Sequence, residues 1–327
     1  MKLLKDFNVQ GKRVLVRCDF NVPLDDSGNI TDDFRIRQSL PTINYLIKNK
    51  AKIIIISHLD PESTGVVDKK YGLKKVGERL EKLLGVKLGE DIQFLENLRF
   101  NKGEIEPSME FAKELAEKGD IFINDAFSVC HRNHASIALL PKLLPSGAGL
   151  LLEKEIESLN KVLQNPAKPM VAIIGGTKVE TKSKLINNIS KPADYVIISG
   201  LIEKEVQEKN IKFDFPEKIV FPEGDLGALD INTESIKLFE EKILQAKTVL
   251  WNGPFGKFEE KEYTKGTLAI ARAIIKSKAF SVVGGGETVE FIQKYGLIDE
   301  FSHVSTGGGA MMAYLSGEEL PGIKALG

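Results

Sequence analysis

The sequence has little cysteine, no long hydrophobic run and almost no net charge. Only Cys18 and Cys130 are present, without CxxC spacing, so neither a disulfide framework nor a structural zinc site is indicated. No apolar run approaches the length of a transmembrane helix, and the first residues lack the hydrophobic segment of a signal peptide. The formal net charge of -1 argues against a general binder of nucleic acid or membrane surfaces. We therefore expect a cytoplasmic monomer that acts on small molecules, without nucleic-acid or membrane partners.

Length and composition predict two domains built on parallel β-sheets. A chain of 327 residues, 42% hydrophobic and 28% charged, is longer than one typical core requires. Short β-branched runs alternate with amphipathic segments such as residues 41–47, which is typical of repeated β-α-β units. The runs hold few polar residues, as expected for parallel strands covered by helices on both faces. They lie at residues 14–16, 53–56, 92–94 and 121–123, and then at 170–174, 195–198, 218–221, 248–251, 280–283 and 301–304.

The boundary between the two halves is marked by a helix and two prolines. Residues 152–163 have a helical pattern, and Pro166 and Pro169 stop the helix and stiffen its exit. We expect the fold class α/β, with two doubly wound parallel-sheet (Rossmann-like) domains joined by a helix and hinge. The first domain covers residues 1–165, including an interdomain helix at about 150–164. The second covers residues 166–327, and its last residues are expected to pack back on the first domain.

Glycine-rich segments follow four of the predicted strands in the second half. Residues 280–288 run from an apolar strand into three glycines and then Glu287 and Thr288, where a helix is expected to start. Glycines let backbone N–H groups approach a ligand, and the start of a helix favours an anion. A tight turn explains a single such segment equally well. The same form recurs at residues 173–178, 249–254 and 303–309, which indicates one phosphate-binding crevice.

Charged and amide side chains follow the strands of the first half. Asp19 and Asn21 come after the first strand, His58 after the second, Arg99 after the third and Arg132 after the fourth. Ligands of open parallel sheets bind beyond the carboxyl ends of the strands, so these side chains are expected to converge. Each arginine alone would be read as a surface charge. Together with Arg35 they predict an anion site.

In this order the motifs closely resemble those of the phosphoglycerate kinase family, and the resemblance spans nearly the whole chain. In the first half they are RCDFNVP at residues 17–23, SHL at 57–59, LENLRF at 95–100, NDAF at 124–127 and HRNHAS at 131–136. In the second half they are GGTKV at 175–179, WNGPFG at 251–256, GGGET at 284–288 and STGGGA at 305–310.

The resemblance implies a glycolytic kinase, a transferase that moves a phosphoryl group between ATP and 3-phosphoglycerate with Mg²⁺ and by hinge-bending. It places the acid on the first domain, at Asp19, Asn21, Arg35, His58, Arg99 and Arg132. It places ATP or ADP on the second, at Gly176, Lys178, Lys182, Asn252, Glu259, Gly284, Gly285, Gly286, Glu287, Thr288, Gly307 and Gly308. Arg35 and Lys178 would be catalytic cations, and Glu287 would ligate the metal. Such a transfer needs positioned cations and exclusion of water rather than a nucleophilic side chain.

Three departures from the family pattern are visible. Asp60 and Pro61 follow the SHL motif where the family has Gly-Arg-Pro, so one arginine of the acid site is missing. Glu287 replaces the family's aspartate and keeps the carboxylate. The second half is shortened between about residues 200 and 233, where the family builds its adenine pocket. This shortening predicts weak discrimination between ATP and GTP; the alternative is that the remaining helices repack and rebuild an apolar slot for the base.

Two other functions remain open from the sequence. A non-catalytic relative that binds the acid or the nucleotide, as a scaffold or regulator, would explain the missing arginine and the shortened second half. A dinucleotide-dependent dehydrogenase would explain the doubly wound pattern, but GxGxxG is absent after the first strand of either half. A P-loop of the GxxxxGKS or GxxxxGKT form is also absent.

Overall fold

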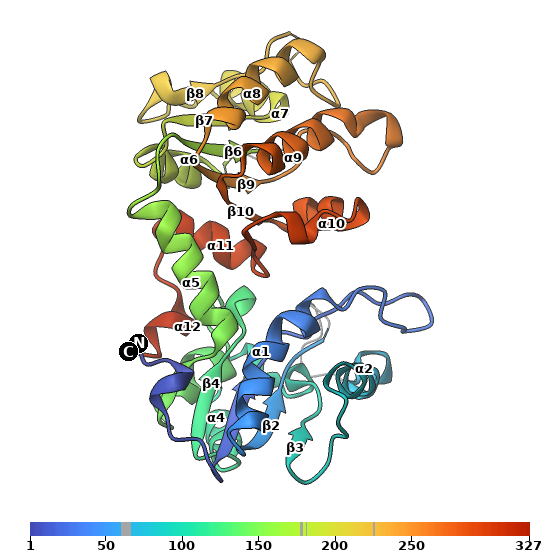
Figure 1. Cartoon of the computed structure of the whole chain (residues 1–327). Helices are drawn as coiled ribbons and strands as arrows, with labels where there is room; N and C mark the ends of the chain where they lie inside the picture. Colours follow the sequence, from blue (N-terminus) through green and yellow to red (C-terminus); the bar gives the residue numbers. More distant parts are fainter. Residues whose placement is uncertain (60–66, 177–178, 181, 225) are drawn as a thin grey trace. The chain divides into compact units, whose positions relative to one another are not determined.

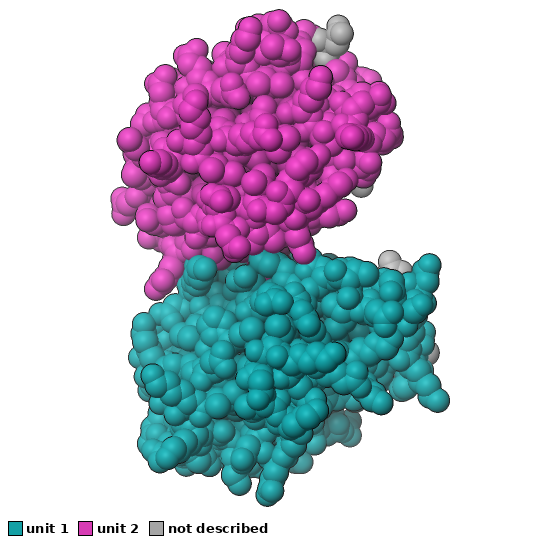
Figure 2. All heavy atoms as spheres, turned by 45° about the vertical axis from the view of Figure 1, so that its right-hand side comes forward, with its two compact units in different colours: residues 1–155, 319–327 teal, residues 156–318 magenta. Residues whose placement is uncertain are grey.

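The computed structural model describes residues 1–59, 67–176, 179–180, 182–224 and 226–327. Within those ranges no helix is both long enough and apolar enough to cross a membrane. The chain forms two compact units, distinguished by colour in Figure 2: unit 1 contains Met1–Glu155 and Glu319–Gly327, and unit 2 contains Ile156–Glu318. The division falls inside one helix, α5 (Leu150–Leu163). The last residues are attached to unit 1 by a hydrogen bond from Gly322 N–H to the Cys130 carbonyl, at 2.9 Å.

Unit 1 is a five-stranded parallel sheet in the order β3-β2-β1-β4-β5, with helices around it (Figure 1). The strands are β1 (Arg13–Arg17), β2 (Lys52–Ile56), β3 (Ile92–Phe94), β4 (Ile121–Asn124) and β5 (Ser146–Ala148). The helices are α1 (Phe34–Lys48), α2 (Lys74–Leu84), α3 (Lys102–Ile105), α4 (Met109–Ala116) and, near the C-terminus, α12 (Pro321–Lys324).

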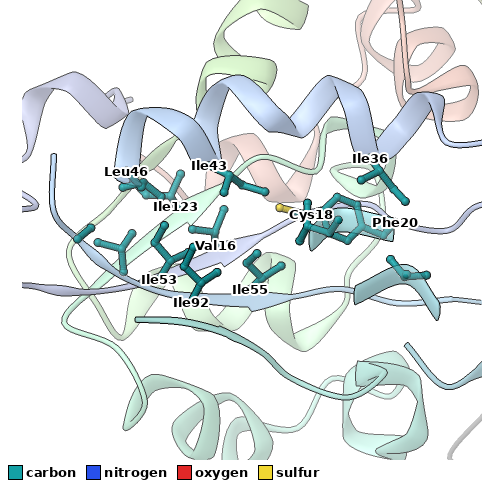
Figure 3. Close-up of a cluster of buried hydrophobic side chains, with 14 of the residues drawn as sticks. Val16, Cys18, Phe20, Ile36, Ile43, Leu46, Ile53, Ile55, Ile92 and Ile123 are labelled. Atoms are coloured by element: carbon teal, nitrogen blue, oxygen red, sulfur yellow. The ribbon is translucent and has the colours of Figure 1, made fainter. Parts of the chain in front are cut away.

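The core of unit 1 explains why its strands read as continuous apolar runs. Figure 3 shows Val16 of β1, Ile53 and Ile55 of β2, and Ile92 of β3 packed with Ile43 of α1. All five side chains are buried, with at most 8% of their surface exposed. Burial of each large aliphatic side chain contributes roughly 1.5–3 kcal/mol, so the sheet and α1 stabilise each other.

Unit 2 is a six-stranded parallel sheet in the order β11-β10-β9-β6-β7-β8. Its strands are β6 (Met170–Ile174), β7 (Tyr195–Ile198), β8 (Ile219–Val220), β9 (Thr248–Asn252), β10 (Phe280–Gly284) and β11 (His303–Val304). Its helices are α6 (Ser183–Ser190), α7 (Gly200–Glu208), α8 (Thr233–Gln245), α9 (Lys265–Ser277), α10 (Gly286–Lys294) and α11 (Gly308–Leu315).

The predicted fold class is confirmed, since both units are parallel sheets with helices. The first predicted helix is the clearest difference in detail. It begins at Phe34 rather than at Pro41, so the proline lies inside α1. A proline removes one helical hydrogen bond and is expected to mark a boundary, but Ile36, Ile43 and Leu46 on one face of α1 are fully buried in the core. Packing of that face outweighs the lost bond.

The start of α5 is held by a buried acid, Asp125, which directly follows β4. Its Oδ1 accepts a hydrogen bond of 3.0 Å from Leu151 N–H, and its Oδ2 has no hydrogen-bond partner among the described residues. A side chain at Gly149 would overlap Oδ1, so only glycine fits there. Burial raises the pKa of Asp125 to about 7, although Thr42 and the amides of Leu151 and Leu152 act in the opposite direction.

We therefore predict that Asp125 makes unit 1 less stable as the pH rises. The folded-state pKa lies above the ordinary 3.8, so the stabilising contribution is complete below that value and is lost as the pH rises through about 7. Between pH 5 and 8 the loss is about 3 kcal/mol. Asp125→Asn keeps an oxygen acceptor without titrating. Urea unfolding gives the free energy of unfolding of both proteins at each pH. Between pH 5 and 8 this free energy should fall for the unmodified protein relative to Asp125→Asn, and parallel curves would contradict the prediction.

Candidate active site

The ends of β1 and β2 and the start of α1 bring four of the six predicted anion-binding residues of unit 1 together, Asp19, Asn21, Arg35 and His58. Arg35 lies in the first turn of α1, and its Nη1 donates to Asp19 Oδ2 at 2.7 Å and to the Asn21 carbonyl at 3.1 Å. Burial alone would raise the pKa of Asp19, but Arg35, together with hydrogen bonds from Ser128 and the Asn21 N–H, lowers it below its ordinary value. Asp19 is therefore ionised at neutral pH, and it fixes Arg35 beside the end of β1.

His58 completes this group from the end of β2. Its Nε2 lies 3.7 Å from Asp19 Oδ1, and only 2% of the residue is exposed. Burial lowers the pKa of His58 well below 6.5; Asp19 acts in the opposite direction, whereas Arg17, Arg99 and Arg35 lower it further. The imidazole is thus neutral at physiological pH.

The two remaining predicted residues of unit 1 lie farther along the same edge. Arg99 is buried in the turn after β3, and its charge reaches both His58 and His134. Arg132 is exposed beyond β4, and its charge lowers the pKa of His131 and His134. No direct contact of Arg132 with Asp19 appears among the described contacts. The edge is rich in cationic groups and suits an anionic ligand.

In unit 2, the four glycine-rich segments follow adjacent strands, β11, β10, β9 and β6. The ends of β6 and β9 touch: Gly175 N–H donates to the Asn252 carbonyl at 2.8 Å, and Gly176 N–H donates to the Pro254 carbonyl at 3.0 Å. A side chain on Gly175 or Gly253 would overlap the backbone of the other loop. Glycine is required there because two main chains approach each other closely.

The ends of β9 and β10 are joined in the same way. Asn252 Nδ2 donates to the Gly284 carbonyl at 3.1 Å, and Gly253 N–H donates to Thr288 Oγ1 at 2.8 Å. Asn252 and Thr288 are buried, and their hydrogen bonds hold the glycine turns in place. Gly285 has a φ of +100°, which only glycine adopts readily. Gly284 and Gly307 are buried, Gly286 is exposed, and Gly308 packs against Gly285 and Gly286.

A cavity of about 270 Å³ opens beside these turns. Its apolar lining comes from Leu201, Leu229, Phe255 and Phe258, and its polar rim includes Gly176, Glu259 and Glu287. Glu259 is exposed at this rim. The size and the apolar walls suit one aromatic ring system.

Lys182 lies beside the β6 loop, where its Nζ donates to the Gly175 carbonyl. Burial lowers the pKa of Lys182 to about 8, and Glu287 counteracts part of this effect. The ammonium group is charged at neutral pH and is poorly solvated, so an approaching phosphate would gain a strong partner. Lys178, the other predicted lysine, lies outside the described residues.

The only predicted metal ligand, Glu287, stands in the first turn of α10 at the cavity rim. Within the described ranges, no group of three or more His, Cys, Asp or Glu side chains is placed to hold a metal ion. Mg²⁺ is commonly held by one or two carboxylates together with substrate phosphates and water. One exposed carboxylate near the glycine turns fits such an ion and does not fit a metal held by protein alone.

Comparison with known proteins decides the family. The sequence profile described as "Phosphoglycerate kinase" matches residues 4–212 and 202–318. The chain belongs to the phosphoglycerate kinase family. A phosphoglycerate kinase of Borrelia hermsii is 39% identical over 391 aligned residues, covering 100% of this chain and 99% of the relative.

Solved structures of phosphoglycerate kinases are similar to this chain over nearly its whole length. The phosphoglycerate kinase of Coxiella burnetii has a TM-score of 0.85 and 34% identity, covering 99% of this chain and 98% of that chain. The one from Pyrococcus horikoshii has a TM-score of 0.86 and 30% identity, covering 100% and 98% respectively. The two-sheet architecture is therefore that of the family.

This member of the phosphoglycerate kinase family is short. The alignment with the Borrelia relative runs over 391 positions, 64 more than the 327 residues of this chain. The family profile matches in two pieces that overlap at residues 202–212, in α7 and just after it. The break in the match falls within the segment that the sequence marks as abbreviated. Leu201 and Leu229, on either side, still line the cavity.

Several side chains that hold the site were not singled out from the sequence. Arg17 at the end of β1 is fully buried and contacts His58, whereas a charge at a strand end is usually read as exposed. Ser128 donates to Asp19 from a turn 109 residues away. Ser199 Oγ donates to the Gly176 carbonyl at 2.9 Å. Arg17 is the last residue of β1, directly after the apolar run at residues 14–16, so the sequence pattern gave no signal that its charge is buried. The substitution at residues 60 and 61 lies outside the described residues.

Proposed function

We propose that this chain is an active phosphoglycerate kinase that transfers a phosphoryl group between ATP and the carboxylate of 3-phosphoglycerate. A carboxylate oxygen attacks the γ-phosphorus, the bond from that phosphorus to the β-bridging oxygen breaks, and ADP leaves with the electron pair. The product is 1,3-bisphosphoglycerate, and the reverse step regenerates ATP. The observation that carries this proposal is the family match over the whole chain, and the cationic side chains of unit 1 and the glycine turns of unit 2 support it.

The roles proposed for the residues are those that the family resemblance implies. Unit 1 would bind the acid through Asp19, Asn21, Arg35, His58, Arg99 and Arg132, and unit 2 would bind Mg-nucleotide. The glycine turns and Lys182 would hold the phosphates, Glu259 the ribose, and Glu287 the metal, which would neutralise phosphate charge. Arg35 and Lys178 would stabilise the charge on the moving group. We further propose a cytoplasmic monomer, without nucleic-acid or membrane partners.

A coupled assay tests the proposed function. Purified chain, ATP, 3-phosphoglycerate and Mg²⁺ should yield ADP, and omission of the acid should abolish its formation. No turnover with both substrates, but measurable binding of either one, would favour the non-catalytic relative instead. Family membership replaces the dehydrogenase interpretation.

Selectivity for the purine base should be weak. The cavity walls are apolar. Such walls contact the faces of a purine ring but form no hydrogen bonds with the polar groups at its edges. Most of the nucleotide affinity would come from the phosphate end. We expect kcat/KM for ATP and GTP to agree within about tenfold, because an apolar pocket rejects a similar ring poorly. A preference for ATP above about a hundredfold would show that polar groups read the base.

Hinge-bending is the second prediction of this function. The proposed acid residues belong to unit 1 and the proposed nucleotide residues to unit 2, so transfer requires the two substrates to be brought together and shielded from water. We expect α5 and the proline exit at residues 165–169 to act as part of the hinge. Small-angle scattering should show a smaller radius of gyration with both substrates than with either one. An unchanged radius would contradict closure.

A further inference from the structure

A second polar cluster lies beneath the acid site of unit 1, and it is fully enclosed by protein. Arg17 at the end of β1 and Glu104 of α3 both have 0% exposure, and Ser136 between them is also buried. Two opposite charges without water contact are costly to bury unless each has several partners. Their contacts therefore indicate what the pair does.

Glu104 is bound on both carboxylate oxygens. Its Oε2 accepts from Ser136 N–H at 2.9 Å, and its Oε1 accepts from Ser136 Oγ–H at 2.6 Å. The same Oε1 lies 3.7 Å from Arg17 Nη2 and 3.8 Å from His134 Nδ1. Ser136 Oγ in turn accepts from Arg17 Nε at 2.9 Å. Glu104 thus holds the guanidinium both directly, by charge, and through one hydroxyl.

Arg17, oriented by Glu104, in turn contacts the ring of His58. Its Nη1 donates to the Cys18 carbonyl at 2.5 Å, and its Nη2 lies 3.1 Å from His58 Nδ1. A guanidinium carries only donors, so Nδ1 must be the acceptor in that contact. The single proton of the neutral ring is then on Nε2, the atom that faces Asp19.

We propose that Glu104 is a positioning residue of the acid site, which acts through Arg17 to hold His58 as the neutral Nε2–H tautomer beside Asp19. This inference rests on the proposed function of Asp19, Arg35 and His58 as the acid site. The geometry makes His58 an uncharged donor with a fixed direction. Its contribution to substrate binding is then set by orientation and not by titration.

The charges around His58 are consistent with that role. Burial lowers its pKa well below 6.5, Asp19 acts in the opposite direction, and Arg17, Arg99 and Arg35 lower it further. Glu104 lies close to Arg17 and His134. The neighbours of His58 in the sequence, Ser57 and Leu59, carry no charge.

The first test uses the unmodified protein. The chain has four histidines, so each imidazole can be assigned in a long-range ¹H–¹⁵N spectrum by replacing them one at a time with glutamine. For His58 we expect a pyridine-like Nδ1 and a pyrrole-like Nε2, both unchanged from pH 5.5 to 8. A protonated Nδ1, or titration near pH 6.5, would overturn the proposal whether or not the enzyme turns over.

The second test uses Glu104→Gln with Glu106→Gln as its matched control. Glu106 lies two residues away, is exposed and pairs with Lys102. Glu104→Gln should shift the His58 nitrogen signals and raise KM for 3-phosphoglycerate about tenfold, with little change in KM for ATP, because one charge-assisted contact is removed from Arg17. Glu106→Gln should match the unmodified protein in each measurement.

The outcomes separate the inference from the proposed function. A folded Glu104→Gln variant with unchanged His58 signals and unchanged KM would overturn the positioning role. If that variant does not fold, Ser136→Ala decides, since it removes the bridging hydroxyl and keeps both charges. It should move the same His58 signals in the same direction, and unchanged signals would again overturn the inference. Absence of turnover in the unmodified protein would refute the proposed function alone.

Discussion

Arg35→Ala should lower kcat by about a thousandfold while KM for 3-phosphoglycerate changes much less, because a cation that acts on the moving phosphoryl group contributes mainly in the transition state. Arg35 is suited to this role. Its side chain is one-third exposed, at 34%, yet its position is fixed by the 2.7 Å contact with Asp19. The measurement is steady-state kinetics in both directions of the reaction, in which the changes in kcat and in KM are determined separately.

Arg37→Ala is the matched control for this variant. Arg37 lies on the same helix, is 52% exposed and pairs with Asp33 at 2.8 Å. Its loss removes an arginine of the same helix without touching Asp19, so kcat should stay near that of the unmodified protein. If Arg35→Ala raised KM alone, Arg35 would be a binding residue only. The same test applies to Lys178→Ala, which we expect to resemble Arg35→Ala.

Glu287→Ala should have the second largest effect, a loss of about a hundredfold in kcat at low Mg²⁺, since the proposed carboxylate ligand of the metal is removed. Part of this loss should be recovered by raising the Mg²⁺ concentration, because the remaining ligands are phosphates and water. The Mg²⁺ concentration for half-maximal activity is the measurement. Glu290→Ala is the control, an exposed glutamate one turn farther along α10. Equal Mg²⁺ dependence in both variants would exclude Glu287 as a ligand.

Much of the fold could be predicted because parallel strands carry a strong local signal. The runs at residues 170–174 and 195–198 coincide with β6 and β7 as found. Strand β5, Ser146–Ala148, was missed because it consists of small residues with no β-branched side chain. Its place comes from pairing with β4, a contact that no local pattern encodes.

The candidate site could be predicted only where a motif and a strand end coincide. Asp19 and His58 follow strands, so the sheet topology brings them together. Glu104 gave no such signal, since its partners Arg17 and Ser136 lie 87 and 32 residues away in the chain. Contacts of that range depend on tertiary packing, and an isolated glutamate on a short helix reads as a surface charge.

The buried carboxyl at the start of α5 has a consequence for how this protein exchanges protons with its solvent. Between pH 4 and 7, roughly, the unfolded chain has released the proton of Asp125 and the folded chain retains it. Folding of unit 1 therefore takes up a proton that the buffer must supply. The heat of unfolding measured by calorimetry in this range includes the ionisation heat of the buffer, and it will differ between buffers at the same pH even though the protein is the same.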